Sequence, residues 1–135
     1  MLYLDTNILV YSLVNQDNGK MIASQALINQ CIADSSLLLS PLILQELAFT
    51  LAKLNLPQAM IRDSFEAFKV FVAFDIDMAL CDSGFQLALA SNMLRSINDA
   101  IHARFAERHA SRLVTFDAGF KKFIPHISIP IDVIS

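Results

Sequence analysis

Four carboxylates with similar surroundings are the residues of this sequence most able to do chemistry together: Asp5 in LYLDTN, Glu46 in LILQELAF, Asp99 in SINDAIHARF and Asp117 in LVTFDAGF. Carboxylates are rarely buried without a partner, and four of them brought together without cations would repel one another. Oxygen-only ligands suit Mg²⁺ or Mn²⁺, and such ions activate water beside a scissile phosphate. The sequence therefore predicts one shared metal site and the hydrolysis of phosphodiester bonds.

Asp5 and Asp117 each come directly after an expected strand, formed by residues 2–4 and 113–116 respectively. In open parallel sheets, ligands bind beyond the carboxyl ends of the strands. Both positions therefore suit a site at that edge of a sheet. The alternative for each residue is a helix N-cap, a position that Asp commonly fills.

Glu46 lies in a helix, expected over residues 41–55, that is apolar nearly all round. Such a helix is normally buried. Its polar members fall on one stripe: Glu46, Thr50 and Lys53. Lys53 is too far along the helix for the usual helical ion pair with Glu46. Glu46 therefore either faces water on a narrow stripe or points into a cleft, and we favour the cleft.

Asp99 also has two interpretations. Ser96 and Asp99 have the spacing of a capping box, with Asp99 in the first turn of a helix over 98–110. Asp99 also heads a stripe of small residues that continues through Ala103, Ala106 and Ala110. That stripe would let the helix approach the sheet closely and would bring Asp99 to its rim.

The elements that must position these acids alternate between strands and helices. Strands are expected over residues 2–4, 36–40, 70–74, 112–116 and 127–129, and helices over 20–33, 41–55, 57–69, 77–92 and 98–110. Thr6 and Asn7 are expected to form a turn, and residues 117–123 a short turn or helix. In the helix over 20–33, the spacing predicts that Ile22, Ala26, Leu27 and Ile32 face inward. The strands are continuous apolar runs, which predicts cover on both faces and hence a three-layer α/β/α sandwich around a mainly parallel sheet.

The composition suits one α/β domain over residues 1–135 with an extended apolar interior. Hydrophobic residues make up 55% of the chain and the mean hydropathy is +0.50. No apolar run reaches the ~18 residues of a membrane span, and the N-terminus does not read as a signal peptide. The apolar excess therefore predicts a buried sheet plus a protein interface. Only two cysteines are present, Cys31 and Cys81, and a cytoplasmic chain would keep both reduced and structural.

The charge is acidic overall but uneven. A net charge of −3 and a pI near 5.4 argue against a nucleic-acid binder. Six of the ten Lys and Arg residues nevertheless lie between positions 95 and 122. Within that stretch, the candidates for a phosphate-binding track are Arg95, Arg104, Lys121 and Lys122. The alternative is a solvated helix face followed by a basic turn.

The three histidines, His102, His109 and His126, lack the spacing of a metal-ligand pair. Because His102 and His109 are seven residues apart on one expected helix, they could share a face. We expect packed or surface positions for all three. No P-loop lysine motif is present either, which excludes nucleotide binding of that type.

Taken together, LDTNILVY at the N-terminus, Glu46, NDAIHARFA and LVTFDAGF resemble a PIN domain, in order and along the whole chain. The most similar subgroup is the VapC-like toxin ribonucleases of bacterial and archaeal toxin–antitoxin pairs. The first and last motifs are the more specific. The resemblance implies an α/β/α sandwich that binds Mg²⁺ or Mn²⁺ and cleaves RNA, and that pairs with itself and with a cognate antitoxin protein.

By the same resemblance, the catalytic acids map onto Asp5, Glu46, Asp99 and Asp117, and Asp5, Asp99 and Asp117 are the metal ligands. The supporting polar residues are Thr6, Asn7 and Thr115. A further acidic group is less easily placed: Asp75, Asp77 and Asp82. A loop and a first helical turn are the preferred interpretation for these three.

Three other classes of protein compete with the nuclease. A haloacid-dehalogenase-type phosphotransfer enzyme needs a second Asp two residues after the first, where this chain has Asn7. A phosphate-accepting receiver domain needs an acidic pair just before its phosphorylated Asp. A non-catalytic PIN-like module for binding RNA or protein usually lacks some of the acids, whereas all four are present here.

Overall fold

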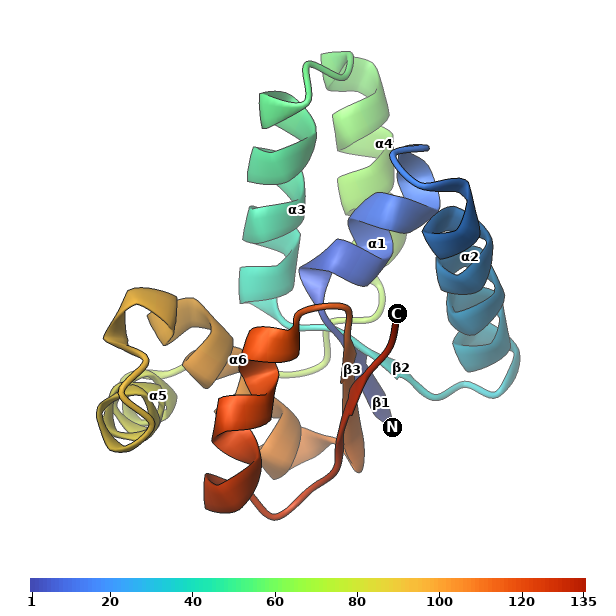
Figure 1. The fold of residues 1–135 in the computed structure, drawn as a ribbon. Helices are drawn as coiled ribbons and strands as arrows, with labels where there is room; N and C mark the ends of the chain where they lie inside the picture. The colour runs from blue at the N-terminus through green and yellow to red at the C-terminus, as the bar shows by residue number, and fades with distance from the viewer.

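The computed structural model describes all residues, 1–135, as a four-stranded sheet flanked by helices (Figure 1). The strands are β1 (Leu2–Leu4), β2 (Leu37–Leu38), β3 (Arg112–Thr115) and β4 (Ile131–Val133). They lie in the order β2-β1-β3-β4 and every pairing is parallel. Tyr3 in β1 pairs with Leu38 on one side and Leu113 on the other. The α/β/α sandwich with a parallel sheet is as predicted.

Two groups of helices surround the sheet (Figure 1). The first comprises α1 (Thr6–Leu13), α2 (Asn18–Ala33), α3 (Pro41–Lys53) and α4 (Gln58–Lys69), in which α1 packs on α2 and α3, and α3 on α4. The second comprises α5 (Met78–Ala90) and α6 (Ile97–His109), which pack on each other. Two 3₁₀ segments complete the chain, η1 (Leu94–Ser96) and η2 (Ala118–His126). None of the helices combines the length and apolar character needed to cross a membrane.

The core lies between the sheet and both helix groups. Its largest fully buried side chains include Tyr3, Phe105, Phe120 and Phe123. Of the small residues predicted to bring α6 close to the sheet, Ala103 and Ala106 are fully inaccessible and Ala110 is half-buried. On its other side, α6 approaches Gly84 so closely that a Cβ there would lie 2.5 Å from Ile101 Cγ1. This close contact explains a glycine in the middle of α5, where its helix propensity is poor.

The predictions of strands over residues 70–74 and 127–129 are wrong. After α4 the backbone keeps turning, because Phe71 N and Val72 N donate to carbonyls three residues back, and only an isolated bridge joins Val72 to Leu39. The last strand forms later, at Ile131–Val133. The 3₁₀ segment η2 uses residues up to His126, and Pro130 contributes only its carbonyl, which accepts from Leu113 N.

Three local predictions also need correction. Thr6 and Asn7 open α1 rather than forming a turn, because Asp5 caps the helix. In α2 the buried residues are Ser24, Ile28 and Cys31. Of the residues predicted to face inward there, Ile22, Ala26 and Ile32 are exposed and Leu27 is half-buried. Apolar residues occur on several sides of this helix, so their spacing did not determine which side packs.

The capping box at Ser96 is also absent. The Ser96 side chain makes no capping hydrogen bond, because the 3₁₀ turn η1 leads directly into α6. The alternative for Asp99, a place at the rim above a stripe of small residues, agrees with the structure.

Candidate active site

Asp5 is held in one orientation where β1 ends and α1 begins. Its Oδ1 accepts from Thr6 N at 2.7 Å and its Oδ2 accepts from Thr115 Oγ1 at 2.7 Å. Only 6% of Asp5 is exposed. Burial raises the pKa of Asp5, and the positive charge of His102 and the two hydrogen bonds only partly offset this. The site thus contains a buried carboxylate whose ionised form is incompletely compensated by protein groups.

Thr115, at the end of β3, connects the first acid to the last. Its hydroxyl donates to Asp5, accepts from Asn7 Nδ2 at 3.2 Å and accepts from Asp117 N at 2.9 Å. A hydroxyl has one proton and two lone pairs, so Thr115 uses its full capacity here. Asn7 Oδ1 in turn accepts from Phe116 N at 3.3 Å. Because β1 and β3 are parallel neighbours, both acids lie at one edge of the sheet.

Glu46 approaches the same edge from α3, which begins with the N-cap Ser40 and with Pro41 in its first turn. Its Oε1 accepts from Thr6 Oγ1 at 2.8 Å and bonds to His102 Nε2. Burial alone would raise the pKa of Glu46, but the bond and charge of His102 and the bond from Thr6 outweigh it and hold the pKa below its usual value. Glu46 therefore faces the cleft that its apolar helix predicted.

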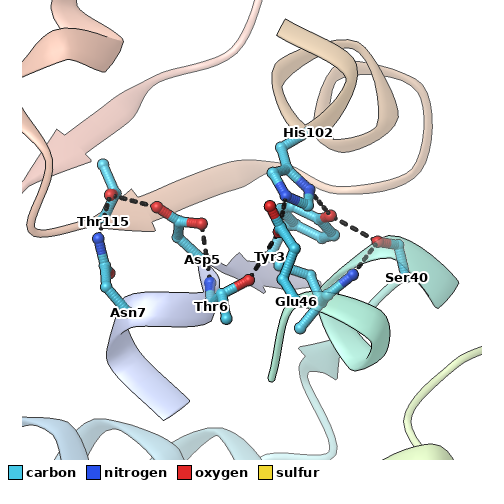
Figure 2. Close-up of polar contacts among 9 residues, drawn as sticks. Tyr3, Asp5, Thr6, Asn7, Ser40, Glu46, His102 and Thr115 are labelled. Carbon is cyan, nitrogen blue, oxygen red and sulfur yellow. Dashed lines mark hydrogen bonds and ion pairs between the residues drawn. The ribbon is translucent and has the colours of Figure 1, made fainter. Parts of the chain in front are cut away.

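His102 is the site residue that the sequence did not single out. The side chain is fully buried in α6, as a packed histidine would be. Both ring nitrogens are engaged, Nε2 by Glu46 and Nδ1 by Tyr3 Oη at 2.6 Å (Figure 2). Burial alone would lower the pKa of His102, but the bond to Glu46 and the surrounding carboxylates raise it. The available signal was its position three residues after Asp99, which places both on one face of a helix.

Asp99 and Asp117 complete the acidic group. Both line the pocket that also contains Asp5 and Glu46, which has a volume of about 660 Å³. Burial, together with the negative charges of Asp5, Asp117 and Glu46, raises the pKa of Asp99 from 3.8 to about 7 even though His102 acts in the opposite direction. Asp117 is more exposed and caps η2 through Gly119 N at 2.8 Å. Four acids from four separate segments thus face one hollow.

The donors in this pocket fit a hard divalent cation. Ligand atoms of Asp5, Glu46 and His102 lie within 4.8 Å of one another. Since both His102 nitrogens already bond protein groups, the carboxylate oxygens are the available ligands. Asp99 and Asp117 add further carboxylates to the same pocket. Oxygen donors of this kind suit Mg²⁺ or Mn²⁺.

None of the basic residues proposed as a phosphate track lines this pocket. These residues are Arg95, Arg104, Lys121 and Lys122. Arg104 is half-buried and bonds Glu107 at 2.7 Å and the His126 carbonyl at 3.3 Å. The other three are exposed on the 3₁₀ segments η1 and η2. A contact between these residues and RNA stays a prediction.

A different cation lies beside the pocket. The Lys20 ammonium stands 5.0 Å from the ring centroid of Tyr11 and 5.2 Å from that of Phe116. Tyr11 lines the pocket, and Phe116 directly precedes Asp117. A cation is attracted to the face of an aromatic ring, so Lys20 places a positive charge beside Tyr11 at the wall of the pocket.

The second acidic group is divided among three places. Asp75 lines a smaller neighbouring hollow, which shares Leu42, Gln45 and Asn98 with the main pocket. Asp77 caps α5 through Leu80 N at 2.8 Å. Asp82 is exposed on α5. None of the three lines the main pocket.

Comparison with known proteins agrees with the fold. The family model that describes the PIN domain matches residues 2–124. The chain belongs to the PIN domain family. No curated protein sequence matched it.

Among solved structures, this PIN domain is similar to a chain of VapBC2 from Rickettsia felis bound to a DNA fragment from their promoter, with 18% identity, full coverage of both chains and a TM-score of 0.68. It is also similar to FitAcB from Neisseria gonorrhoeae, with 19% identity, 98% of this chain and 96% of that chain covered, and a TM-score of 0.70. A structure of FitAB bound to an IR36 DNA fragment gives 19% identity, 97% and 93% coverage, and a TM-score of 0.71. At these identities the likeness concerns the fold.

Proposed function

We propose that this PIN domain is a metal-dependent endoribonuclease and the toxin of a toxin–antitoxin pair. The observation that carries the proposal is the meeting of four carboxylates in one pocket, where the pKa of Asp99 reaches about 7. Such a group of acids is poorly compensated by the protein alone. The sequence motifs of a VapC-like toxin and membership of the PIN family support RNA as the substrate.

Each acid has a proposed role. Asp5, Asp99 and Asp117 would hold Mg²⁺ or Mn²⁺, while Thr6, Asn7 and Thr115 keep Asp5 and Asp117 in place. The ion would supply a lowered pKa for attacking water and charge neutralisation at the scissile phosphate. Glu46, with its Oε1 bound by Thr6 and His102, would orient the water and accept its proton through the other oxygen.

The direct test is cleavage of total RNA by the purified protein with Mg²⁺ or Mn²⁺, followed by mapping of the cut ends. We expect cleavage that chelation abolishes and that Asp5→Asn and Asp99→Asn remove while both variants stay folded. Full cleavage by the Asp5→Asn protein would contradict the assignment of these acids to the active site. A calorimetric titration with Mn²⁺ tests the alternative of a non-catalytic module. If no binding is seen at millimolar metal, the non-catalytic module is favoured.

The partners follow from the same proposal. Similar structures are VapBC2 and FitAB complexes bound to DNA, and this chain exposes large apolar side chains, including Phe49 at the pocket, 70% exposed. We infer a cognate antitoxin, a homodimer and a cytoplasmic setting. Co-purification with the product of an adjacent short reading frame tests the antitoxin, and light scattering of the purified chain tests the dimer.

A further inference from the structure

Three polar side chains form a buried chain behind Glu46. The Tyr3 hydroxyl lies 2.7 Å from Ser40 Oγ and 2.6 Å from His102 Nδ1, and His102 Nε2 continues the chain to Glu46. Tyr3, Ser40 and His102 are each fully buried. They come from β1, the N-cap of α3 and α6 (Figure 2). One continuous chain thus joins three elements and ends in the pocket.

Such a chain is costly for a core. Burying hydroxyl and imidazole groups opposes folding unless every group finds a partner, and an apolar filling of the same space would not carry that requirement. Here every group does find one: Ser40 Oγ also accepts from Ile43 N at 3.2 Å. The only member with solvent access is Glu46, whose side chain is 26% exposed. The chain of hydrogen bonds therefore supports Glu46 in the pocket as well as the packing of the core.

The His102 ring cannot reorient without loss. Because Tyr3 binds Nδ1 and Glu46 binds Nε2, turning the ring would break both bonds at once. On the other side of Glu46, Thr6 Oγ1 donates to Oε1. Both bonds therefore meet the same carboxylate oxygen, and Oε2 is the oxygen that neither Thr6 nor His102 binds.

We propose that His102 is a positioning residue: with Tyr3 and Ser40 behind it, it fixes the Glu46 carboxylate so that Oε2 is presented to the pocket. The expected effect of His102 on RNA cleavage rests on the proposed nuclease function. The effect of His102 on the position of Glu46 does not depend on that function and can be measured separately.

Two substitutions at His102 separate positioning from packing. His102→Gln keeps an N–H donor near the position of Nε2, whereas His102→Leu fills similar space without a donor. Loss of a polar group that orients a ligand or catalytic residue typically costs 10–100-fold in activity. We expect His102→Leu to lower kcat for RNA cleavage by a factor in this range of about 10–100, with KM changed less than about twofold. His102→Gln should recover most of the loss.

Tyr3→Phe provides a second variant in case His102→Leu does not fold. It removes only the hydroxyl that orients Nδ1, and one hydrogen bond of this kind corresponds to a fall in kcat of roughly threefold to tenfold. His109→Leu and His109→Gln are the matched controls, since His109 lies on the same helix but stacks on Phe74. Both controls should cleave like the unmodified protein.

Crystal structures of Tyr3→Phe and His102→Leu give the readout that is independent of cleavage. A displaced or disordered Glu46 side chain in either variant supports the proposal. An unmoved Glu46 in both, or equal activity of folded His102→Leu and His102→Gln, overturns it. If the unmodified protein cleaves no RNA, the proposed function fails, and the position of Glu46 in these structures still decides this inference.

Discussion

Two acids of the pocket, Asp5 and Glu46, are held by different kinds of partner. Asp5 receives a backbone N–H and a hydroxyl, both from residues at the sheet edge. Glu46 receives a hydroxyl and an imidazole that is anchored in the core. Burial raises the pKa of Asp5 despite its two hydrogen bonds, whereas the bond and charge of His102 hold the pKa of Glu46 below its usual value.

This difference divides the pocket into two halves. The half with Glu46 contains an imidazole bonded to the carboxylate, and the bond to Glu46 and the surrounding acids raise the pKa of His102 against the effect of burial. The half with Asp5 and Asp99 has hydroxyl and amide donors but no bound protein cation. A divalent ion would therefore relieve repulsion mainly in the half with Asp5 and Asp99, while Glu46 stays available for proton transfer.

Substitution of Asp5 should have the largest effect. In Asp5→Asn a proposed metal ligand is lost, and we expect RNA cleavage to fall by more than about 100-fold, since even outer residues at metal sites contribute 10–100-fold. The fold should survive, because a neutral amide is easier to bury than a carboxylate whose pKa burial has raised. Cleavage assays with thermal denaturation measure both effects. Asp82→Asn, an exposed acid on α5, is the control and should change neither.

Asp99 should make metal binding depend strongly on pH. Its folded pKa of about 7 lies above the ordinary 3.8, so a proton must leave before a metal can bind. We expect the affinity for Mn²⁺ to fall by up to about tenfold per pH unit below 7. Calorimetry at pH 5.5, 6.5 and 7.5 measures this. An affinity that is constant over this range would contradict the assignment of Asp99 as a ligand.

The same shift predicts how metal-free stability varies with pH. Between pH values of about 4 and 7 the folded state binds more protons at Asp99 than the unfolded state does, so this residue's contribution to the free energy of unfolding falls as the pH rises through that window. The Asp99→Asn variant should lack this component. Urea denaturation of the unmodified protein and of Asp99→Asn, without metal at pH 5 and pH 7.5, measures how the free energy of unfolding of each changes with pH. If both change by the same amount, the raised pKa of Asp99 is contradicted.

Thr115→Val tests the sheet-edge support of Asp5. The substitution keeps the shape but removes one donor to Asp5 and the acceptor for Asn7 and Asp117 N. We expect unfolding to become easier by about 1–3 kcal/mol and cleavage to fall about tenfold. Thr115→Ser should recover much of both losses. If Thr115→Val behaves like the unmodified protein, Asp5 is held by Thr6 N alone.

Lys20→Met should have the smallest effect. Removing the ammonium near Tyr11 and Phe116 should weaken RNA binding by a few fold at low salt and reduce the slope of log affinity against log salt by about 1. Anisotropy titrations of a labelled RNA with an inactive Asp5→Asn background measure this. Lys53→Met, an exposed lysine at the end of α3, is the control and should leave the slope unchanged.

Much of the fold and part of the site were accessible from sequence pattern. Continuous apolar runs predicted the parallel sheet, and the strand-end rule predicted the placement of Asp5 and Asp117 at one edge. The predicted strands over 70–74 and 127–129 failed because β-branched and aromatic runs also suit half-buried loops. The prediction of which side of α2 is buried was wrong, because apolar residues lie on several sides of this helix.

What the sequence alone determined is the type and order of the carboxylates, the strands that carry Asp5 and Asp117, and membership of a family. Only the tertiary structure decided which polar groups meet them. His102 contacts Glu46 across 56 positions and Tyr3 across 99, so no local pattern could pair them. These bonds exist because α3, α6 and β1 pack around one core, where a buried polar group must find its partner wherever the fold brings one close.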